Sequence, residues 1–586
     1  EAMPLTVNGK LDKRALPAPE YQNREGYRAP GDAIEQILAD IYAQVLGLDR
    51  VGVDDSFFEL GGDSILSMQV VARARAAGVI CRPRDIFVEQ TVARLAQTAT
   101  ITDTDTQSDD GIGPVTASPI IRWLEEQKAA GSPVDHFNQT VVVQAPAGTT
   151  EADVLVMLQA LLDRHAMLRL RVDDDGAGGW SLTVPEPGAV DAAHCLQTVD
   201  VLTDDAVVRA GLRLNPAAGQ MVSALWVTST RRLLAIVHHL AIDGVSWRIL
   251  LEDLNLAWTQ HRSGQPVVLP EPATSFARWS ALLAEHAHHP EVVARSDIWR
   301  QIAATPAALA PVCPEADKLN TAGNLMVNLD VETTRMLLGE VPSAFHTGVN
   351  EILLIAFGLA LNEFLGAGDI PIGIDVEGHG RDEELADDVD LSRTVGWFTA
   401  KYPVALDVGG LDWAQVRAGA PELGALIKAA KERLRALPDG LDYGVLRYLN
   451  DDVDLDGADP PIAFNYLGRQ GATTADTSGD SWQICWDGLA TVSPSVKPPI
   501  PLTHSLVLDA GTVDTDDGPS LCAIWTWAPS VLNFAQVNRL SQLWFDALTG
   551  ICTHVRDGGG GLTPSDIVAG LSQAEIDELQ RQYADS

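Results

Sequence analysis

The sequence has few basic residues for its length. Its 586 residues include 41 lysines and arginines against 80 aspartates and glutamates, which gives a net charge of −39. Phosphate backbones and anionic membrane surfaces repel a chain of this charge, so we expect neither nucleic acid nor membrane as a partner. No apolar run approaches the ~20 residues of a membrane-spanning helix, and the first four residues, Glu-Ala-Met-Pro, do not resemble a signal peptide.

Cysteine is scarce and scattered. The six cysteines, at positions 81, 195, 313, 485, 522 and 552, form no Cys-x-x-Cys motif and have no histidine-rich segment beside them. This pattern predicts reduced thiols in a cytoplasmic protein, with no disulfide framework and no metal site. Apolar residues make up 46% of the chain and charged residues 21%, which is typical of folded domains. The length predicts about four domain-sized units.

The first hundred residues have the pattern of a small helical unit. Residues 17–31 are rich in proline, glycine and charge, which predicts a linker. Apolar spacing and local composition predict helices over 32–46, 64–77, 85–87 and 91–97, which would form a four-helix bundle. Residues 102–111 contain no apolar residue and predict a solvated, flexible tether.

The longer remainder predicts an α/β region. Runs at 140–143, 233–237 and 370–376 predict strands, and residues 152–163, 247–258 and 350–365 predict helices. The region has two halves of comparable size, which divide somewhere near residues 265–300.

One serine has the setting of an attachment site. Gly61 and Gly62 allow a tight backbone path, and Ser64 would lie at the amino end of the second helix. The unsatisfied N–H groups and positive end of a helix favour a phosphate ester there. An isolated match of this kind is usually an ordinary helix cap. The position of Ser64 between helices, after residues 54–60, favours attachment instead.

Two adjacent histidines follow a buried strand. The run 233–237 would deliver His238 and His239 to a cleft, and strand alternation points their side chains in opposite directions. We therefore expect His238 to be a structural core residue. His239, with an ordinary pKa near 6.5, suits general acid or base chemistry. Asp243 is expected to pair with an arginine, and Trp247 opens the apolar face of the next helix.

These motifs resemble parts of nonribosomal peptide synthetases. Residues 30–100 resemble a peptidyl carrier domain, whose serine carries 4′-phosphopantetheine, and residues 1–20 resemble the end of an adenylation domain. The Gly-Gly-Asp-Ser motif, with Asp63, resembles carriers paired with epimerization domains. His-His-x-x-x-Asp-Gly is shared by condensation and epimerization domains, whereas the continuation Val-Ser-Trp-Arg-Ile-Leu (245–250) resembles epimerization domains specifically.

Further epimerization motifs follow in order at residues 118–123, 377–381, 393–399, 438–448 and 464–468. The resemblance implies a multidomain chain: a four-helix carrier bundle, then a two-lobed α/β domain like chloramphenicol acetyltransferase. It implies a linker over 101–112, an N-lobe over 113–290 and a C-lobe over 291–575. Residues 576–586 would begin a link to a downstream condensation domain.

The function implied is epimerization of an L-aminoacyl or peptidyl thioester at Cα to a D/L mixture. The resemblance supplies His239 and Glu377 as the groups that remove and return the proton. Burial would raise the pKa of Glu377 enough for it to act as an acid near neutral pH. Which of the two takes the proton from the L form stays open. The alternatives are an amide-forming condensation enzyme and an inactive carrier-docking scaffold.

Other residues have supporting roles in this interpretation. The helix start near Ser246, and Asn465 or Tyr466, are candidates to stabilise the developing oxyanion. Trp247, Trp397 and Tyr443 are expected as cleft walls or core. Arg381 and Arg393 are expected to hold acids such as Asp243. The implied partners are an upstream adenylation domain, a downstream condensation domain and a phosphopantetheinyl transferase, in bacterial secondary metabolism.

Overall fold

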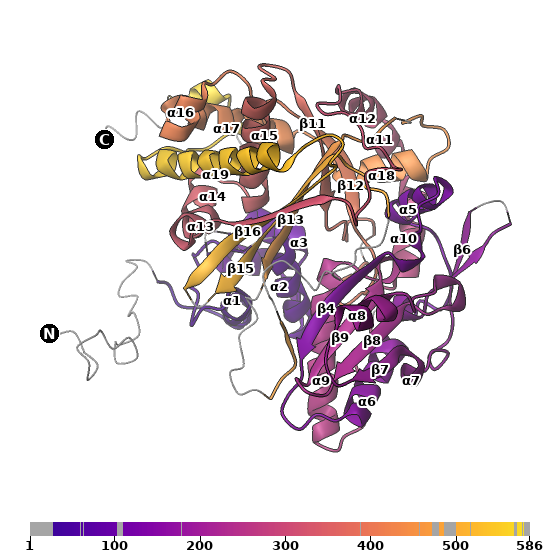
Figure 1. Cartoon of the computed structure of the whole chain (residues 1–586). Coiled ribbons are helices and arrows are strands. Elements are labelled where there is room, and N and C mark those ends of the chain that lie inside the picture. Colours follow the sequence, from indigo (N-terminus) through magenta and orange to yellow (C-terminus); the bar gives the residue numbers. More distant parts are fainter. Residues whose placement is uncertain are drawn as a thin grey trace, which may run out of the picture.

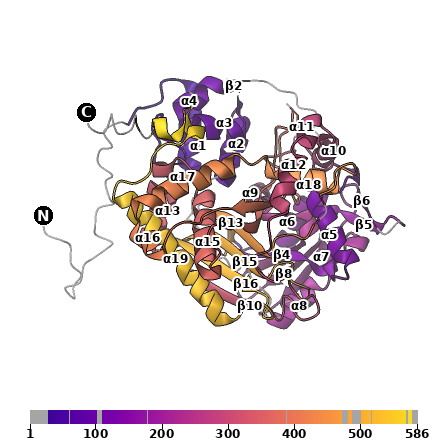
Figure 2. The ribbon, with the colours of Figure 1, turned by 90° about the horizontal axis from the view of Figure 1, so that it is seen from above.

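The structure is a computed structural model that describes most of the chain. The described residues are 27–58, 60–62, 64–101, 109–176, 179–272, 274–386, 388–455, 457–470, 480–485, 500–515, 517–567, 571–576 and 578. The predicted adenylation tail (1–20), most of the tether (102–111) and nearly all of the downstream link (576–586) lie outside them. The described chain forms a helical carrier domain and a two-lobed α/β domain (Figures 1 and 2).

The carrier domain contains four helices, as the sequence predicts. They are α1 (Ala33–Leu46), α2 (Ser64–Ala76), α3 (Pro83–Glu89) and α4 (Val92–Thr98). Helix α1 begins where Asp32 accepts a hydrogen bond from the Glu35 amide at 2.8 Å, and it ends at Gly47, whose φ of 68° is left-handed. A short strand pair, β1 (Val79–Ile80) and β2 (Thr100–Ile101), is not predicted because two residues are too few to show alternation.

The N-lobe is built on a five-stranded sheet with helices on both faces. Its strand order is β14-β4-β9-β8-β7. The strands are β4 (Asn138–Gln144), β7 (Leu196–Val199), β8 (Val222–Val227), β9 (Arg232–His238) and β14 (Gln483–Ile484). Val141 and Val143 belong to the same core cluster as residues of α6 (Glu151–Arg164) and α9 (Gly244–Arg262), whereas Val142 packs with α8 (Asp204–Gly211). Strand β14 lies inside the predicted C-lobe range, so the chain crosses back to the N-lobe.

The C-lobe contains a six-stranded mixed sheet in the order β10-β16-β15-β13-β11-β12. The strands are β10 (Gly323–Asn328), β11 (Ile372–Gly378), β12 (Ala400–Leu406), β13 (Ile462–Gln470), β15 (Leu506–Thr515) and β16 (Gly518–Trp527). Helices α15 (Val349–Leu365) and α19 (Phe534–Arg556) cover one face (Figure 1). Among the described residues no single helix has the length and apolar composition of a membrane span; one pair of helical segments bent by 96°, 331–345 and 349–365, meets the test together.

Strand β11 differs from the predicted strand over 370–376. It begins two residues later, because Ile370 is exposed and Pro371 has no N–H to donate to a neighbouring strand. It also continues to Gly378, so Glu377 lies within the strand and not after it. Ile374 and Val376 pack in the core under α15, and alternation turns Glu377 to the other face of the sheet.

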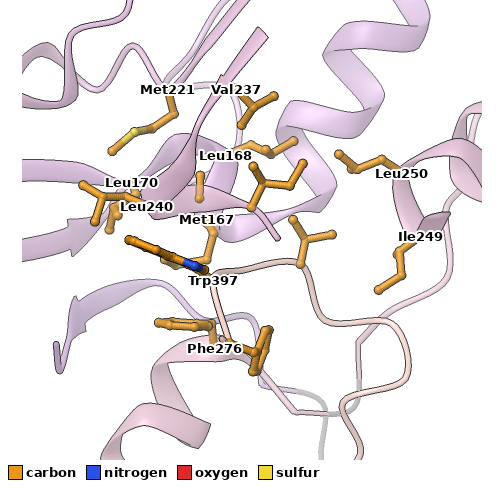
Figure 3. Close-up of a cluster of buried hydrophobic side chains, with 14 of the residues drawn as sticks. Met167, Leu168, Leu170, Met221, Val237, Leu240, Ile249, Leu250, Phe276 and Trp397 are labelled. Carbon is orange, nitrogen blue, oxygen red and sulfur yellow. The ribbon is translucent and has the colours of Figure 1, made fainter. Parts of the chain in front are cut away.

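A long loop between β11 and β12 joins the two lobes. Trp397 of this loop packs in the N-lobe core, together with Phe276 of α10 (Phe276–His286). Figure 3 shows both rings beside Met167 and Leu240 of the N-lobe. The apolar core of the N-lobe therefore continues into the loop that leads to the C-lobe sheet.

Candidate active site

The paired histidines lie where β9 ends. The apolar run 233–237 is mostly buried within the sheet, and the chain then turns through a short 3₁₀ segment, His239–Ala241, before α9 begins. Asp243 caps α9: its Oδ1 accepts the amide of Ser246 at 2.7 Å. The motif His-His-x-x-x-Asp-Gly is thus a strand end, a turn and a helix start.

His238 is a buried structural residue, as the alternation predicts. Its side chain is 1% exposed, and its Nε2 lies 3.0 Å from the carbonyl oxygen of Val134. Its Nδ1 accepts the amide of Leu240 at 3.2 Å. Burial lowers the pKa of His238 to about 4, so the ring is neutral at neutral pH. Both nitrogens are occupied by the backbone.

His239 points into different surroundings. Its ring stacks on Phe137 with centroids 5.0 Å apart and touches Trp397 at 4.3 Å. Its Nε2 lies 3.0 Å from the side-chain nitrogen, Nε2, of Gln139. Gln139 belongs to β4 and was not singled out from the sequence. Burial lowers the pKa of His239 to about 4. A neutral imidazole is able to accept a proton.

Asp243 forms a buried ion pair with Arg381. The Arg381 Nη2 lies 3.0 Å from Asp243 Oδ1 and also donates to the hydroxyl of Ser246 at 3.0 Å. The expected pairing of Asp243 with an arginine is therefore present. Arg393 makes a different contact: it pairs with Asp253 of α9. Because Asp243 binds Arg381 and caps a helix, its carboxylate is not free to take a proton from a substrate.

Ser246 does not offer a donor to a substrate. Its side chain is fully buried, its amide is bonded to Asp243, and its hydroxyl donates to the carbonyl of Gly396 or to Asp243. Both hydrogens of Ser246 therefore already have protein acceptors, which argues against Ser246 itself as the oxyanion donor.

Glu377 lies on the C-lobe sheet among other polar groups. Its neighbours in the sheet are Lys401 of β12 and Asn465 of β13. The Glu377 side chain is exposed, so water reaches it, yet protein encloses it closely enough to raise its pKa to about 7. Partial desolvation of the carboxyl by the surrounding protein is the main cause, and the negative charges of Asp509 and Asp375 add to it. Such a carboxyl exchanges protons near neutral pH.

Asn465 bridges two carboxyl groups. Its Nδ2 donates to Glu377 Oε2 at 3.2 Å, and its side chain also hydrogen-bonds Asp509 of β15. Burial raises the pKa of Asp509 to about 6. The side-chain amide of Asn465 is therefore engaged by both carboxyl groups. Asn465 thus holds Glu377 in place.

Tyr466 and Tyr443 lie away from Glu377. Tyr466 follows Asn465 on β13 and therefore faces the opposite side, where it packs against the C-lobe core and its hydroxyl lies 3.5 Å from Thr512. Tyr443 is buried in α18 (Gly440–Tyr448), and Arg447 donates to its hydroxyl at 2.8 Å. Tyr443 is core, as expected, whereas the oxyanion role considered for Tyr466 does not fit its position.

Lys401 is a cation that sequence reasoning missed. It lies directly opposite Glu377 in the antiparallel β11–β12 pair, so both side chains point to one face. Its Nζ binds Asp375 at 2.7 Å and also Asp459, and these charges raise its pKa. Lys401 stays protonated and lowers the pKa of Glu377, opposing part of the upward shift.

One short stretch of chain links the surroundings of His239 to those of Glu377. Trp397 touches the His239 ring, and Ala400, three residues later, pairs with Gly378 next to Glu377. Three extended residues span at most about 10 Å. No hydrogen bond joins the two side chains in the described part of the chain. The loop from Trp397 to Ala400 therefore connects the imidazole with the strand that carries the carboxyl.

The carrier domain is seated against the catalytic domain. Arg75 of α2 binds Glu383 at 2.8 Å and Asp390 at 2.5 Å, both in the loop between β11 and β12. A Cβ built on Gly61 would lie 3.8 Å from Arg469 Nη1 of β13. Ser64 opens α2, and its side chain lies outside the described part. The start of α2 is therefore close to the strand that carries Asn465.

Comparisons with known proteins agree with this architecture. The family described as Condensation domain matches residues 122–483, and the family described as Phosphopantetheine attachment site matches residues 36–99. Chondramide synthase of Chondromyces crocatus is 35% identical over 98% of this chain, and one linear gramicidin synthase polypeptide of Brevibacillus parabrevis is 35% identical over 99%. The chain spans only 15% and 11% of the lengths of these two relatives.

Solved structures show the same fold. The epimerization domain from the third module of tyrocidine synthetase B aligns with a TM-score of 0.66 and 25% identity, over 77% of this chain and 99% of that one. The X-domain from teicoplanin biosynthesis aligns with a TM-score of 0.56 and 18% identity, over 77% and 96%. The second likeness concerns the fold alone.

Proposed function

The chain belongs to the Condensation domain family and carries a phosphopantetheine-binding domain, as nonribosomal peptide synthetases do, and from this premise we propose that it is an epimerization enzyme. It inverts the Cα of an L-aminoacyl or peptidyl group attached through Ser64 and yields a D/L mixture. The phosphopantetheine arm supplies a thioester link, which makes the α proton more acidic than an amide would.

The residues around Ser64 fit such an arm. Ser64 begins a helix of 13 residues, and the amino end of a helix favours a phosphate ester. A Cβ on Gly62 would lie 2.3 Å from the ring of Phe57, so only glycine allows the chain to cross this ring just before the serine. Asn465 lies four residues before Arg469 on β13, about 13 Å at the usual rise of a strand. This short path supports delivery of the substrate towards Glu377.

The observation that carries the proposal is a base and an acid on different lobes. His239 is neutral and able to take a proton, and Glu377 has a pKa of about 7 and is able to give one. Two groups from different lobes suit inversion, because the proton leaves one face of Cα and returns to the other. The likeness to an epimerization domain supports the same assignment.

The alternative is an amide-forming condensation enzyme, which the family match also allows. Such an enzyme needs a second loaded carrier and an acceptor amine. An epimerization enzyme needs neither, and the carrier that it uses precedes it in this chain. Exchange of the α proton without any acceptor therefore separates the two functions.

The test is deuterium uptake at Cα. The full chain is converted to its phosphopantetheine form, loaded with L-aminoacyl or dipeptidyl groups and incubated in deuterated water, and the released acid is analysed for deuterium and chirality. We expect deuterium with a D/L mixture, and its loss in Ser64→Ala. Glu363→Gln, at an exposed carboxylate of α15, is the matched control for Glu377→Gln. Confirmed loading without exchange would contradict the proposal.

The same assay assigns the two proton-transfer roles. If His239 takes the proton from the L form, Glu377→Gln still exchanges deuterium into the L substrate with retention, because His239 returns it to the same face. His239→Gln then exchanges nothing from the L side. The opposite pattern gives the first step to Glu377. Inversion by both variants would remove the pair from the mechanism.

The proposed partners follow from the family. A phosphopantetheinyl transferase modifies the carrier, an upstream adenylation domain selects and loads the amino acid, and a downstream condensation domain takes the epimerized product. We propose that these steps take place in the cytoplasm.

A further inference from the structure

Trp247, Gln139 and His239 form a chain of hydrogen bonds. The indole N–H of Trp247 donates to the side-chain oxygen of Gln139 at 2.8 Å. The side-chain nitrogen of Gln139 lies 3.0 Å from Nε2 of His239. Gln139 comes from β4, where it pairs with Val237 of β9, one residue before the histidine pair. Trp247 comes from the first turn of α9 and is buried.

The indole fixes the orientation of the amide. An indole N–H only donates, so it requires the oxygen of Gln139 on its side and turns the amide N–H₂ towards His239. Nε2 of His239 must then accept, and the proton of the neutral ring must be on Nδ1. A proton on Nε2 would face the N–H of Gln139, so the arrangement disfavours the charged imidazolium.

The charged groups around His239 do not by themselves explain why the neutral ring carries its proton on Nδ1. Asp243 lies nearby, but it is paired with Arg381 at 3.0 Å. His238, on the same strand end, is neutral and bonded to the backbone. Phe137 of the segment before β4 and Trp397 of the interlobe loop pack on the ring and carry no charge. Backbone groups of His239 and Ile242 also hydrogen-bond the ring, and Gln139 is the polar side chain whose hydrogen bond at Nε2 favours a proton on Nδ1.

We propose that Gln139 is a catalytic residue that donates to the carbonyl oxygen of the substrate during the step in which His239 takes the α proton, and that Trp247 is the positioning residue that aims it. This inference rests on the proposed epimerization. When the substrate is in place, the N–H of Gln139 turns from the single lone pair of Nε2 to the carbonyl oxygen. The C–H bond then breaks, its proton moves to the vacated lone pair of Nε2, and its electron pair moves onto the carbonyl oxygen, where the N–H of Gln139 stabilises the negative charge that develops.

Two other donors considered for this oxygen are already engaged. The amide of Ser246 is bonded to Asp243, and the N–H₂ of Asn465 is bonded to Glu377 and Asp509. Gln139 has a second side-chain N–H beside the imidazole, and the first N–H turns from His239 to the carbonyl oxygen when the substrate is in place. Gln139 therefore offers the donor that the chemistry needs next to the base.

The test compares Gln139→Leu, Trp247→Phe and the double variant in the deuterium assay on the full loaded chain. Loss of one oxyanion donor typically costs about 10²–10³ in kcat, and we expect this for Gln139→Leu. Trp247→Phe should lower kcat about tenfold with little change in KM. Without the indole donor the Gln139 amide can rotate, and its oxygen then accepts a hydrogen bond from the protonated His239 ring. This raises the pKa of His239, so the acid limb of the pH profile should move to higher pH. In the Gln139→Leu background Trp247→Phe should change nothing further.

Trp258→Phe is the matched control. It makes the same change in the same helix, but the indole of Trp258 donates to the carbonyl of Asp480 at 3.1 Å, away from His239. We expect its kcat within twofold of the parent. A tenfold loss in Trp258→Phe, equal losses from Trp247→Phe in both backgrounds, or a Gln139→Leu variant within threefold of the parent would overturn the proposal.

Nitrogen NMR of ¹⁵N-histidine-labelled chain gives a readout that does not need activity. The His239 signals, assigned by their absence in His239→Gln, should report Nδ1–H in the parent and lose this preference in Trp247→Phe. An Nε2–H tautomer in the parent overturns the inference. A different outcome is a parent that shows the Nδ1–H form while no loaded substrate exchanges its α proton. That result would contradict the epimerization proposal and the role of Gln139 towards the substrate, but it would agree with the hydrogen bonds that orient the His239 ring.

Discussion

Replacing Arg75 with alanine should detach the carrier domain far more than replacing Arg84. The Arg75 side chain is 17% exposed and lies between Glu383 and Asp390, which are 7% and 23% exposed. Arg84 binds Glu384 at 3.1 Å, and these side chains are 70% and 47% exposed. Both arginines belong to the carrier and all three acids to the loop between β11 and β12, so the two substitutions differ in burial and in the number of acids bound, two for Arg75 and one for Arg84.

The expected magnitudes follow from that difference. Breaking a fully buried ion pair costs about 3–5 kcal/mol, and partial hydration of Arg75 reduces this to about 2–3 kcal/mol. An exposed pair contributes about 0.2–1 kcal/mol. Since about 1.4 kcal/mol is a factor of ten, Arg75→Ala should weaken docking by about 30–150-fold. Arg84→Ala should weaken it by no more than about fivefold.

Amide hydrogen exchange on the full chain measures docking directly. The amide of Leu391 donates to Glu383 at 2.8 Å, so its protection should fall in Arg75→Ala together with that of α2. Deuterium uptake by the loaded substrate should fall in parallel. The double variant Arg75→Met with Glu383→Gln should recover part of the protection, because it removes the unpaired buried acid. Equal effects of Arg75→Ala and Arg84→Ala would refute the reasoning.

Three other substitutions test single features of the structure. Asp509→Asn removes a negative charge that raises the pKa of Glu377. The alkaline limb of the pH–rate profile, where activity falls as Glu377 loses its proton, should therefore move to lower pH by up to about one unit. An unmoved alkaline limb would contradict the interaction between Asp509 and Glu377. His238→Ala leaves the Val134 carbonyl and the Leu240 amide buried without partners, and each unsatisfied group lowers the free energy of unfolding by about 1–3 kcal/mol. This variant should therefore have a lower Tm. His239→Ala should instead remove exchange of the α proton with little change in Tm. Gly62→Ala places a Cβ 2.3 Å from Phe57 and should destabilise the carrier by about 1–3 kcal/mol and slow modification of Ser64, while Gly211→Ala, with open space around it, should not lower stability.

Features that depend on local pattern could be predicted from the sequence. The predicted helix over 32–46 differs by one residue from α1, because apolar spacing and the Asp32 cap are both local signals. The different environments of His238 and His239 follow from strand alternation alone. The pairing of Asp243 with an arginine was expected because an acid so near a glycine turn often fixes the loop, although the sequence left Arg381 and Arg393 both open.

Features that depend on which strands are neighbours could not be predicted. Gln139 reaches His239 only because β4 pairs with β9 across about a hundred residues of sequence. Asp509 meets Glu377 only because β15 lies beside β13, which lies beside β11. Gln139 stands between two other polar residues, Asn138 and Thr140, just before the apolar part of the strand, so nothing in the sequence singled it out. The crossing of β14 to the N-lobe is of the same kind.

One loop connects the carrier with both groups of the candidate active site. It follows Gly378, the last residue of β11 and the neighbour of Glu377. Arg381 of this loop forms an ion pair with Asp243, which lies four residues after His239. Leu391 accepts from Arg381 through its carbonyl and donates to Glu383 through its amide.

Glu383 is the residue that binds Arg75 of the carrier, and Trp397 at the far end of the loop packs on the His239 ring. The contact that seats the carrier and the contacts that position the imidazole therefore share one hydrogen-bonded segment. If the proposed pair of proton-transfer groups acts as we expect, a movement of this loop that releases the carrier should also disturb the support of Asp243 and the packing on His239.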